Sequence, residues 1–228
     1  MASVKPNTTI KDYQNFVNYV YGMSNDRYFS LGDMLTNVQR FTMRGLKGIR
    51  KQDREKTKSN LLISLSWFMS IMNQLHIDIE DKIWKRFPYL CSYCGSCPCR
   101  CKTEKIKKRM AVRVNEKKRP KSFSAFQKMF EEIYPSKTRS LEHAGVHLAE
   151  EVGELAESLF TYRGGHSDDS FKRVELEAAD FLSCIMGVFN SLDIDIAKEL
   201  SKMFKENCHV CHKAPCCCDF KEITTYKS

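Results

Sequence analysis

The chain has 228 residues, and its composition, 42% hydrophobic and 29% charged, fits a soluble globular protein of one large or two small domains. It contains no run of about 20 uninterrupted apolar residues, so we expect no membrane span. The first residues lack the apolar core of a signal peptide, which predicts a cytoplasmic location. With 37 basic and 28 acidic residues, the net charge of +9 favours anionic partners such as nucleotides or nucleic acid.

Apolar residues recur every three or four positions along most of the chain, which predicts helices. Alternating β-branched runs, which would predict strands, are absent from the sequence. A Gly-, Ser- and Asp-rich stretch at residues 163–169 indicates a loop, and Ser167 or Asp168 is expected to cap the helix after it. The expected helices span residues 10–23, 31–46, 55–74, 79–87, 122–133, 140–161, 170–190 and 195–206.

The two halves of the chain resemble each other. SLGDMLTNV from Ser30 parallels SLEHAGVHL from Ser140, and LHIDIEDKIWKRF from Leu75 parallels LDIDIAKELSKMF from Leu192. Each half then ends in a group of cysteines. We therefore expect an all-α fold of two tandem helical bundles. The expected domains are a first repeat at 1–101, a basic linker at 102–121 and a second repeat at 122–228.

Two acidic clusters lie in the second repeat, on two successive expected helices. The first contains Glu150, Glu151 and Glu154, and the second contains Glu177 and Asp180. Residues three or four apart share one face of a helix, so an antiparallel pair of these helices would bring carboxylates together. Converging carboxylates repel one another unless a cation neutralises them, and oxygen ligands favour Mg²⁺, Mn²⁺ or Ca²⁺. The alternative is a set of ordinary exposed glutamates on surface helices.

The acidic spacing resembles the signature of MazG-like nucleoside triphosphate pyrophosphohydrolases. Here it consists of E-E-x-x-E from Glu150, 22 intervening residues, and E-x-x-D from Glu177. The resemblance implies hydrolysis of nucleoside triphosphates to the monophosphate and pyrophosphate. It implies Mg²⁺ held by Glu151, Glu154, Glu177 and Asp180, with Glu150 or Glu151 activating the attacking water. It also implies paired bundles, so that the two repeats would form an internal pseudo-dimer.

The first repeat carries basic residues where the second carries acids. Arg40 and Arg44 align with Glu150 and Glu154, so the first repeat is expected to keep the fold without the metal site. Arg44 is a candidate to contact substrate phosphate, and ordinary surface charge is the alternative. Three lysines of the last expected helix are further phosphate candidates: Lys198, Lys202 and Lys205.

Ten of the eleven cysteines form two groups that share the spacing C-x₂-C-x₄-C-x-C. Thiolates at this spacing suit tetrahedral zinc, so we expect a structural zinc knuckle at the end of each repeat. Disulfides, an iron–sulfur cluster and free reactive thiols are the alternatives. The expected ligands are Cys91, Cys94, Cys99 and Cys101 in the first group and Cys208, Cys211, Cys216 and Cys218 in the second.

The segment from Lys102 to Lys121 carries ten Lys or Arg residues and two Glu residues. It is either a solvated linker or a contact for nucleic acid. If the chain worked through this segment alone, it would be a non-enzymatic, zinc-stapled helical module that binds nucleic acid or protein. The expected partners are thus a nucleoside triphosphate and, through the linker, nucleic acid. No membrane partner is expected, and a homodimer is compatible with the sequence.

Overall fold

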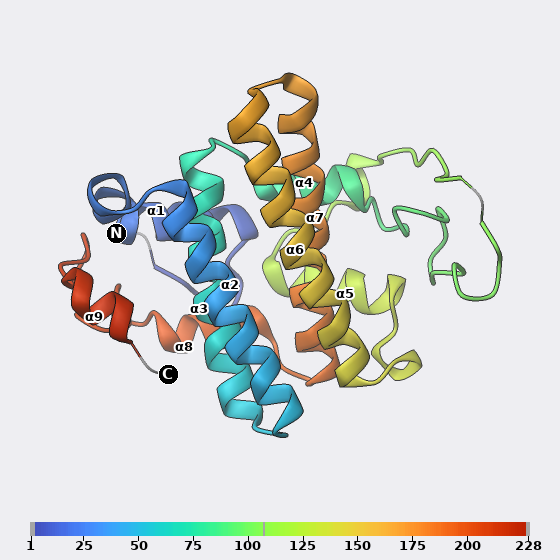
Figure 1. Cartoon of the computed structure of the whole chain (residues 1–228). Coiled ribbons are helices and arrows are strands. Elements are labelled where there is room, and N and C mark those ends of the chain that lie inside the picture. Colours follow the sequence, from blue (N-terminus) through green and yellow to red (C-terminus); the bar gives the residue numbers. More distant parts are fainter. Residues whose placement is uncertain (1–2, 107, 227–228) are drawn as a thin grey trace. The chain divides into compact units, whose positions relative to one another are not determined.

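The structure is a computed structural model that describes residues 3–106 and 108–226. Within these ranges all regular secondary structure is helical, with nine α-helices, two 3-10 helices and no strand (Figure 1). The all-α class expected from the sequence is confirmed for this part of the chain. None of its helices is both long and apolar enough to span a membrane.

The described chain forms two compact units. Unit 1 joins the residues up to Asp78 with those from Ile196 onward, and unit 2 comprises Ile79–Asp195. These boundaries differ from the expected domains of 1–101, 102–121 and 122–228. Each unit combines three helices of one sequence repeat with the last helix and the cysteine group of the other.

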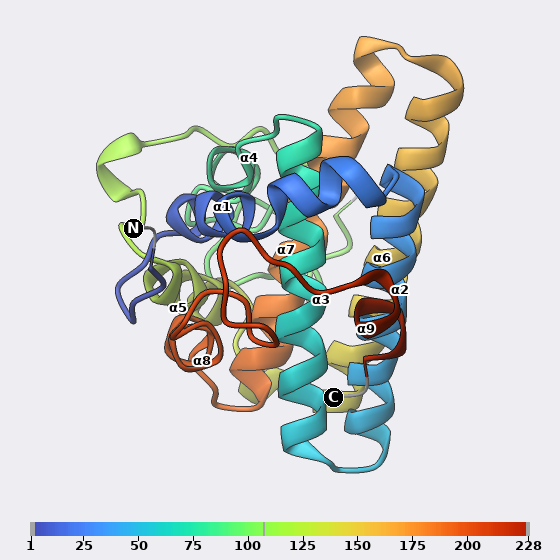
Figure 2. The same cartoon turned by 90° about the vertical axis from the view of Figure 1, so that its left-hand side faces the viewer.

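Unit 1 contains five described helices: α1 (Ile10–Tyr28), α2 (Leu31–Arg50), α3 (Arg54–Gln74), α8 (Ile196–Met203) and α9 (Phe220–Thr225). Of these, α2 and α3 lie side by side (Figure 2). Gly48 permits the close approach, because a Cβ atom there would lie 2.8 Å from the backbone nitrogen of Thr57 on α3. The apolar faces of α1, α2 and α3 supply most of the core of this unit.

Unit 2 contains four described α-helices: α4 (Ile79–Arg86), α5 (Phe123–Ile133), α6 (Leu141–Gly165) and α7 (Asp168–Ser191). The long helices α6 and α7 form a hairpin. Ser140 caps α6, and Ser167, one of the two expected caps, begins α7 through a capping box with Ser170. This hairpin is the arrangement that the acidic motif requires.

In unit 2, the segment after α4 packs on α5, although the two belong to different repeats. The rings of Phe87 and Phe130 meet edge to face, with 5.1 Å between their centroids. The backbone N–H of Cys99 donates a hydrogen bond to the carbonyl of Ile133 at 2.8 Å. An aromatic contact and a backbone bond therefore fix the first cysteine group to this unit.

Unit 1 contains the equivalent contacts, made by the segment after α8. The ring of Phe204 meets that of Phe16 on α1, with 5.5 Å between centroids. The backbone N–H of Cys216 donates to the carbonyl of Val20 at 2.7 Å. The apolar residues that follow α4 and α8 thus cover the first helix of the other repeat. Sequence similarity alone does not indicate this exchange.

A pair of side-chain hydrogen bonds recurs in both units. In unit 1, Gln14 donates to the carbonyl of Ile77 at 2.7 Å, and Asn73 donates to the carbonyl of Gln14 at 3.0 Å. In unit 2, Gln127 donates to the carbonyl of Ile194 at 2.7 Å, and Asn190 donates to the carbonyl of Gln127 at 3.0 Å. The two bundles are therefore built alike at the end of their third helix.

Each of the eight expected helices is found, although α1, α2 and α6 extend further than expected at their C-terminal ends. The residues at these ends are polar, and polar residues are compatible with both helix and loop, so the sequence does not show where the helix ends. The short helix α9 was not expected. Asp219 and Glu222 form a capping box at its start, and this D-x-x-E pattern is the signal that indicates it.

The C-terminal part of the expected basic linker contacts α4. Trp84 Nε1 donates to Glu116 Oε1 at 3.0 Å, and Arg119 forms an ion pair with Glu80 at 3.4 Å. One basic residue of this segment, Lys107, lies outside the described residues. The end of the linker therefore packs within unit 2, and the expectation that it contacts nucleic acid stays a prediction.

Candidate functional site

Three acidic side chains of the α6–α7 hairpin converge in unit 2. Carboxylate oxygens of Glu151, Glu177 and Asp180 all lie within 4.8 Å of one another. The spacing brings them together because Glu177 and Asp180 are three residues apart on α7. Glu154, the fourth expected ligand, is not among the oxygens within this distance. The structure therefore brings together three of the four carboxylates that the sequence predicted as ligands.

Glu150, one of the two expected catalytic residues, lies outside the converging group. Its side chain is 60% exposed, and its Oε2 atom lies 3.5 Å from Nδ1 of His147. The ring of His147 in turn contacts His143, with 3.1 Å between the two Nε2 atoms. Of the two expected catalytic residues, only Glu151 belongs to the group.

The carboxyl groups of the site disfavour one another's ionisation, although Arg173 Nε lies 3.7 Å from Glu177 Oε1. Burial, followed by the charges of Asp180, Glu154 and Glu177, raises the pKa of Glu151 to about 8. Burial and the charge of Asp180 also raise the pKa of Glu177. Glu151 Oε2 is buried and has no hydrogen-bond partner in the described part of the chain. A cation between these oxygens would relieve the repulsion and bind the unpaired atom.

Arg86, the last residue of α4, forms a two-bond ion pair with Asp180. Its Nε donates to Oδ1 at 3.1 Å and its Nη2 donates to Oδ2 at 2.6 Å. The two side chains are only 10% and 14% exposed. A cation that binds Asp180 must therefore displace or share these hydrogen bonds. Sequence reasoning missed Arg86 because α4 belongs to the first repeat and nothing in the sequence places it in unit 2.

A second arginine, Arg139, lies against α7 at Gly187. A Cβ atom on Gly187 would lie 2.5 Å from Nη2 of Arg139, so the glycine makes room for the guanidinium. Arg139 Nε is buried without a hydrogen-bond partner among the described residues. The pKa of Cys184 is raised by burial and then by Glu151, and Arg139 opposes this rise, so both charges act near Cys184. Arg139 thus places positive charge near the acidic group.

The four expected phosphate-binding residues all belong to unit 1, whereas the acidic group belongs to unit 2. Arg44 Nη1 donates to the backbone carbonyl of Tyr226 at 3.1 Å. Lys202 forms an ion pair with Glu199 at 2.6 Å. Lys198 and Lys205 are exposed. These contacts do not test phosphate binding, which stays a prediction for all four residues.

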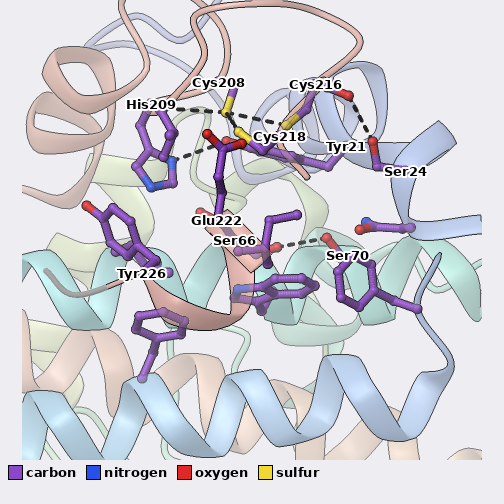
Figure 3. A pocket seen from close by; sticks show the side chains of 17 residues that line it. Tyr21, Ser24, Ser66, Ser70, Cys208, His209, Cys216, Cys218, Glu222 and Tyr226 are labelled. Carbon is purple, nitrogen blue, oxygen red and sulfur yellow. Dashed lines mark hydrogen bonds between the residues drawn. The ribbon is translucent and has the colours of Figure 1, made fainter. Parts of the chain in front are cut away.

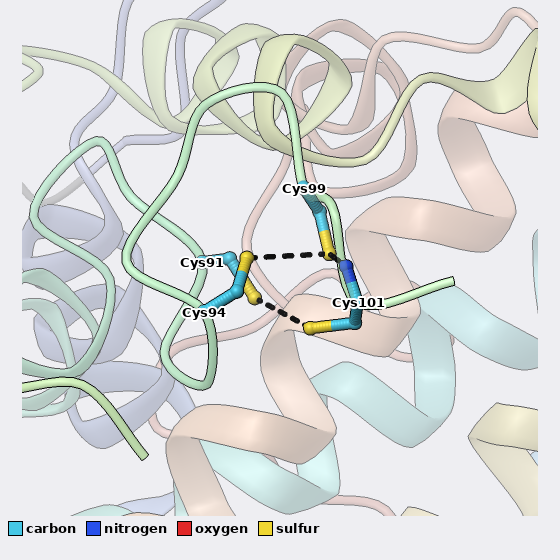
Figure 4. Close-up of side chains that lie close together, drawn as sticks. All are labelled: Cys91, Cys94, Cys99 and Cys101. Atoms are coloured by element: carbon cyan, nitrogen blue, oxygen red, sulfur yellow. Dashed lines mark hydrogen bonds between the residues drawn. The ribbon is translucent and has the colours of Figure 1, made fainter. Parts of the chain in front are cut away.

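The first cysteine group has the geometry of a tetrahedral metal site (Figure 4). The sulfur atoms of Cys91 and Cys101 are 3.7 Å apart, and those of Cys94 and Cys99 are 3.9 Å apart. These separations are far longer than the ~2.05 Å of a disulfide. They match the edge, about 3.8 Å, of a tetrahedron of thiolates that bind zinc at roughly 2.3 Å. Two backbone N–H groups also donate to sulfurs of this group at 3.4 Å.

The second cysteine group has the same arrangement. The sulfur of Cys208 lies 3.5 Å from that of Cys216 and 3.8 Å from that of Cys218, and Cys211 lies 3.8 Å from Cys216. Both sets of four expected ligands therefore come together, and both suit structural zinc.

The other cysteines lie outside the two groups. Cys97 and Cys217 are exposed, and neither belongs to a set of converging ligands. His209, which follows a ligand of the second group, instead contacts the hydroxyl of Tyr21 through Nδ1 at 3.3 Å. The structure thus distinguishes four ligands in each group from their neighbours.

The fold and these sites define an all-α protein with two four-cysteine groups suited to metal. Comparison of the chain with protein-family models, with curated proteins and with solved structures gave no match in any of the three. The resemblance to MazG-like enzymes therefore rests on the acidic motif and its surrounding sequence.

Proposed function

We propose that the chain hydrolyses nucleoside triphosphates to the monophosphate and pyrophosphate, in a Mg²⁺-dependent reaction at the acidic group of unit 2. The observation that carries the proposal is the convergence of Glu151, Glu177 and Asp180, with one buried oxygen of Glu151 lacking a partner. This arrangement is unfavourable without a cation and suits an ion that prefers oxygen ligands. The MazG-like spacing of the same residues supports the same reaction.

The three converging residues would hold Mg²⁺, which when bound offsets the negative charge of the phosphate oxygens. Glu151 is also the better candidate to take a proton from the attacking water, because it lies inside the group. Glu150 is exposed and bound to His147. We assign Glu150 to the surroundings of the site and not to the proton transfer.

Two arginines that the sequence did not indicate are the preferred phosphate-binding residues of unit 2. Arg86 presents a guanidinium to Asp180, and Arg139 keeps a buried Nε without a partner among the described residues. Guanidinium groups bind phosphate oxygens through paired hydrogen bonds. If a cation replaces Arg86 as the partner of the Asp180 carboxylate, the guanidinium of Arg86 becomes available to bind substrate phosphate. Asp180 then keeps a positively charged partner throughout.

In this proposal the two units are an internal pair of MazG-like bundles, and only unit 2 keeps the acidic group. A zinc ion in each cysteine group would tie the segment after α4 to α5 and the segment after α8 to α1. The role of zinc is structural, because every sulfur of each group faces its own group and none belongs to the acidic site. A further dimer of the whole chain is compatible with such a pair.

The experiment is pyrophosphate release from a panel of nucleoside triphosphates with and without Mg²⁺. We expect turnover by the wild type and a loss on the order of 10²-fold or more in Glu151→Gln and Glu177→Gln. Asp169→Asn is the matched control, since Asp169 lies on α7, is 96% exposed and pairs with Lys172 outside the group. Turnover that survives both site variants would contradict the assignment.

The alternative is a non-enzymatic, zinc-stapled module that binds nucleic acid or protein. The observation that favours it is the pair of bonds from Arg86, which occupy both oxygens of Asp180 and partly replace a metal ion. Binding of RNA or DNA by a chain that shows no Mg²⁺-dependent turnover would favour this alternative.

A further inference from the structure

Unit 1 contains a small cavity beside the second cysteine group (Figure 3). Its volume is about 70 Å³, it is partly open to solvent, and its lining includes three of the expected zinc ligands, Cys208, Cys216 and Cys218. Figure 3 shows Tyr21, His209 and Tyr226 around it, close to Cys208. Most of its lining is apolar and aromatic, and the aromatic members are Tyr21, Phe29, Phe41, Trp67, His209 and Tyr226.

The cavity occupies the place in unit 1 that the acidic group occupies in unit 2. Phe41 follows the cap of α2, Ser30, by as many residues as Glu151 follows Ser140, the cap of α6. Ile63 precedes the end of α3 by as many residues as Asp180 precedes the end of α7. Phe41 and Ile63 both line the cavity. Apolar side chains have thus replaced two of the three carboxylates, and the space they border is suited to an apolar ring.

Two arginines lie next to this cavity without an acidic partner. Their guanidinium carbons are 4.9 Å (Arg40) and 5.6 Å (Arg44) from the ring centroid of Phe41. Both donate to one backbone carbonyl, that of Tyr226, at 2.9 and 3.1 Å. Neither forms an ion pair with a described residue, and a carbonyl is neutral, so no described side chain offsets their two positive charges. Burial and the charge of Arg44 accordingly lower the pKa of Arg40.

An anion would bind these arginines better than the carbonyl does. A phosphate adds attraction between opposite charges and accepts paired hydrogen bonds from a guanidinium, which a single neutral carbonyl oxygen does not do. One carboxylate, that of Glu222, also lines the cavity, but it accepts the backbone N–H of Asp219 at 2.9 Å in the cap of α9. The arginine pair therefore favours a ligand that carries a negative group.

One buried polar side chain of the lining makes no hydrogen bond with a described residue, in contrast to the buried serines beside it. Asn25 lines it and is 7% exposed, and among the described residues its side-chain amide makes no hydrogen bond. An amide offers both a donor and an acceptor to a ligand that has a polar edge. A ring with a polar edge would satisfy it, whereas a hydrocarbon would not.

We propose that this cavity is a second, metal-independent ligand site that binds a pyrimidine nucleotide, whose base has a single ring. The ring would lie among the aromatic side chains with its polar edge toward Asn25, and the phosphate would bind Arg40 and Arg44. A cavity of roughly 150 Å³ encloses one benzene ring. A space of about 70 Å³ with an open side therefore takes part of one ring and favours a one-ring base over a two-ring base. The proposal does not depend on the reaction at the acidic group.

The test measures binding of CMP and UMP by titration calorimetry, with no divalent cation added. The chain carries Glu151→Gln and Glu177→Gln, so that the acidic group contributes nothing to the signal. We expect one saturable site per chain. Cytidine, which lacks the phosphate, and ribose 5-phosphate, which lacks the base, should each bind at least ~10-fold more weakly than CMP. AMP, whose base has two rings, should also bind more weakly than CMP.

Arg40→Gln and Arg44→Gln should each weaken CMP binding by about 10-fold. Arg50→Gln is the matched control, because Arg50 is an exposed arginine at the end of the same helix. Unchanged far-UV circular dichroism would show that the variants fold. Absence of saturable binding, tighter binding of AMP, equal binding of ribose 5-phosphate, or CMP binding that survives both arginine variants would each overturn the proposal.

Discussion

Lys82 of α4 forms an ion pair with Glu175 of α7, with 2.7 Å between Nζ and Oε1. Unit 1 has the same pair with the charges exchanged, because Glu199 of α8 binds Lys58 of α3 at 3.0 Å. Lys82 and Glu199 are each the fourth residue of their helix, and Lys58 and Glu175 are equally far from the ends of α3 and α7. If each short helix packed on the bundle of its own repeat, Lys82 would meet Lys58, and Glu199 would meet Glu175. The charges thus favour the exchanged arrangement.

We predict that Lys82→Glu lowers the free energy of unfolding by about 1 kcal/mol, because it places two carboxylates side by side at a partly buried position. Glu175→Lys alone should have a similar effect, and the double variant should recover most of the loss. A double-mutant cycle from urea melts measures the coupling.

The control for this cycle is Lys172→Glu. Lys172 pairs with Asp169 on the same helix, but the two side chains are 70% and 96% exposed, so solvent screens the interaction. Its melt should stay within a few tenths of a kcal/mol of the wild type. Equal destabilisation by Lys172→Glu and Lys82→Glu would show that the exchanged pair has no special role.

The sequence does not predict that α4 and α8 each pack on the helices of the other repeat. Apolar periodicity is local, so it predicted α4 and α8 with their buried faces. Which bundle a short helix covers depends on side chains far away in the sequence, such as Phe130 for Phe87. The opposite charges of Lys82 and Glu199 agree with the exchange, but they carry information only once the structure shows their partners on α3 and α7.

Arg86→Gln should destabilise the Mg²⁺-free protein by on the order of 3 kcal/mol, because the Asp180 carboxylate would lose its partner beside two other acids. Added Mg²⁺ should raise the melting temperature of this variant more than that of the wild type, since the cation no longer competes with the guanidinium. Thermal melts with and without Mg²⁺ measure both effects. A variant that Mg²⁺ does not stabilise would argue against a cation site at Asp180.

The stability of the Mg²⁺-free protein should fall as the pH rises from about 4.5 to about 8. Burial and the neighbouring carboxylates raise the pKa of Glu151 from 4.5 to about 8 in the folded protein. In this pH range the folded state holds a proton that the unfolded state has lost, so the free energy of unfolding decreases with pH. Glu151→Gln should reduce this decrease in urea melts across the range, and Asp169→Asn, at an exposed position of α7, should not. An unchanged slope in Glu151→Gln would contradict the burial of this carboxylate.

The candidate site was predictable to the extent that its residues share local spacing. Glu177 and Asp180 are one turn apart, and the capped hairpin of α6 and α7 brings Glu151 to them. Arg86 and Arg139 were not predictable, since their contacts with α7 come from other elements and leave no periodic pattern. The aromatic cavity of unit 1 was missed for the same reason.

Each cysteine group should bind one zinc ion, giving two per chain by elemental analysis. Cys94→Ser and Cys211→Ser should each remove one ion, and they should lower the melting temperature because the group ties its segment to α5 or α1. Cys97→Ser is the matched control, since Cys97 is exposed and lies between ligands without belonging to the group. Zinc loss in this control would show that the ligand set differs from the one the sulfur distances indicate. A coloured protein containing iron would instead identify the groups as iron–sulfur sites.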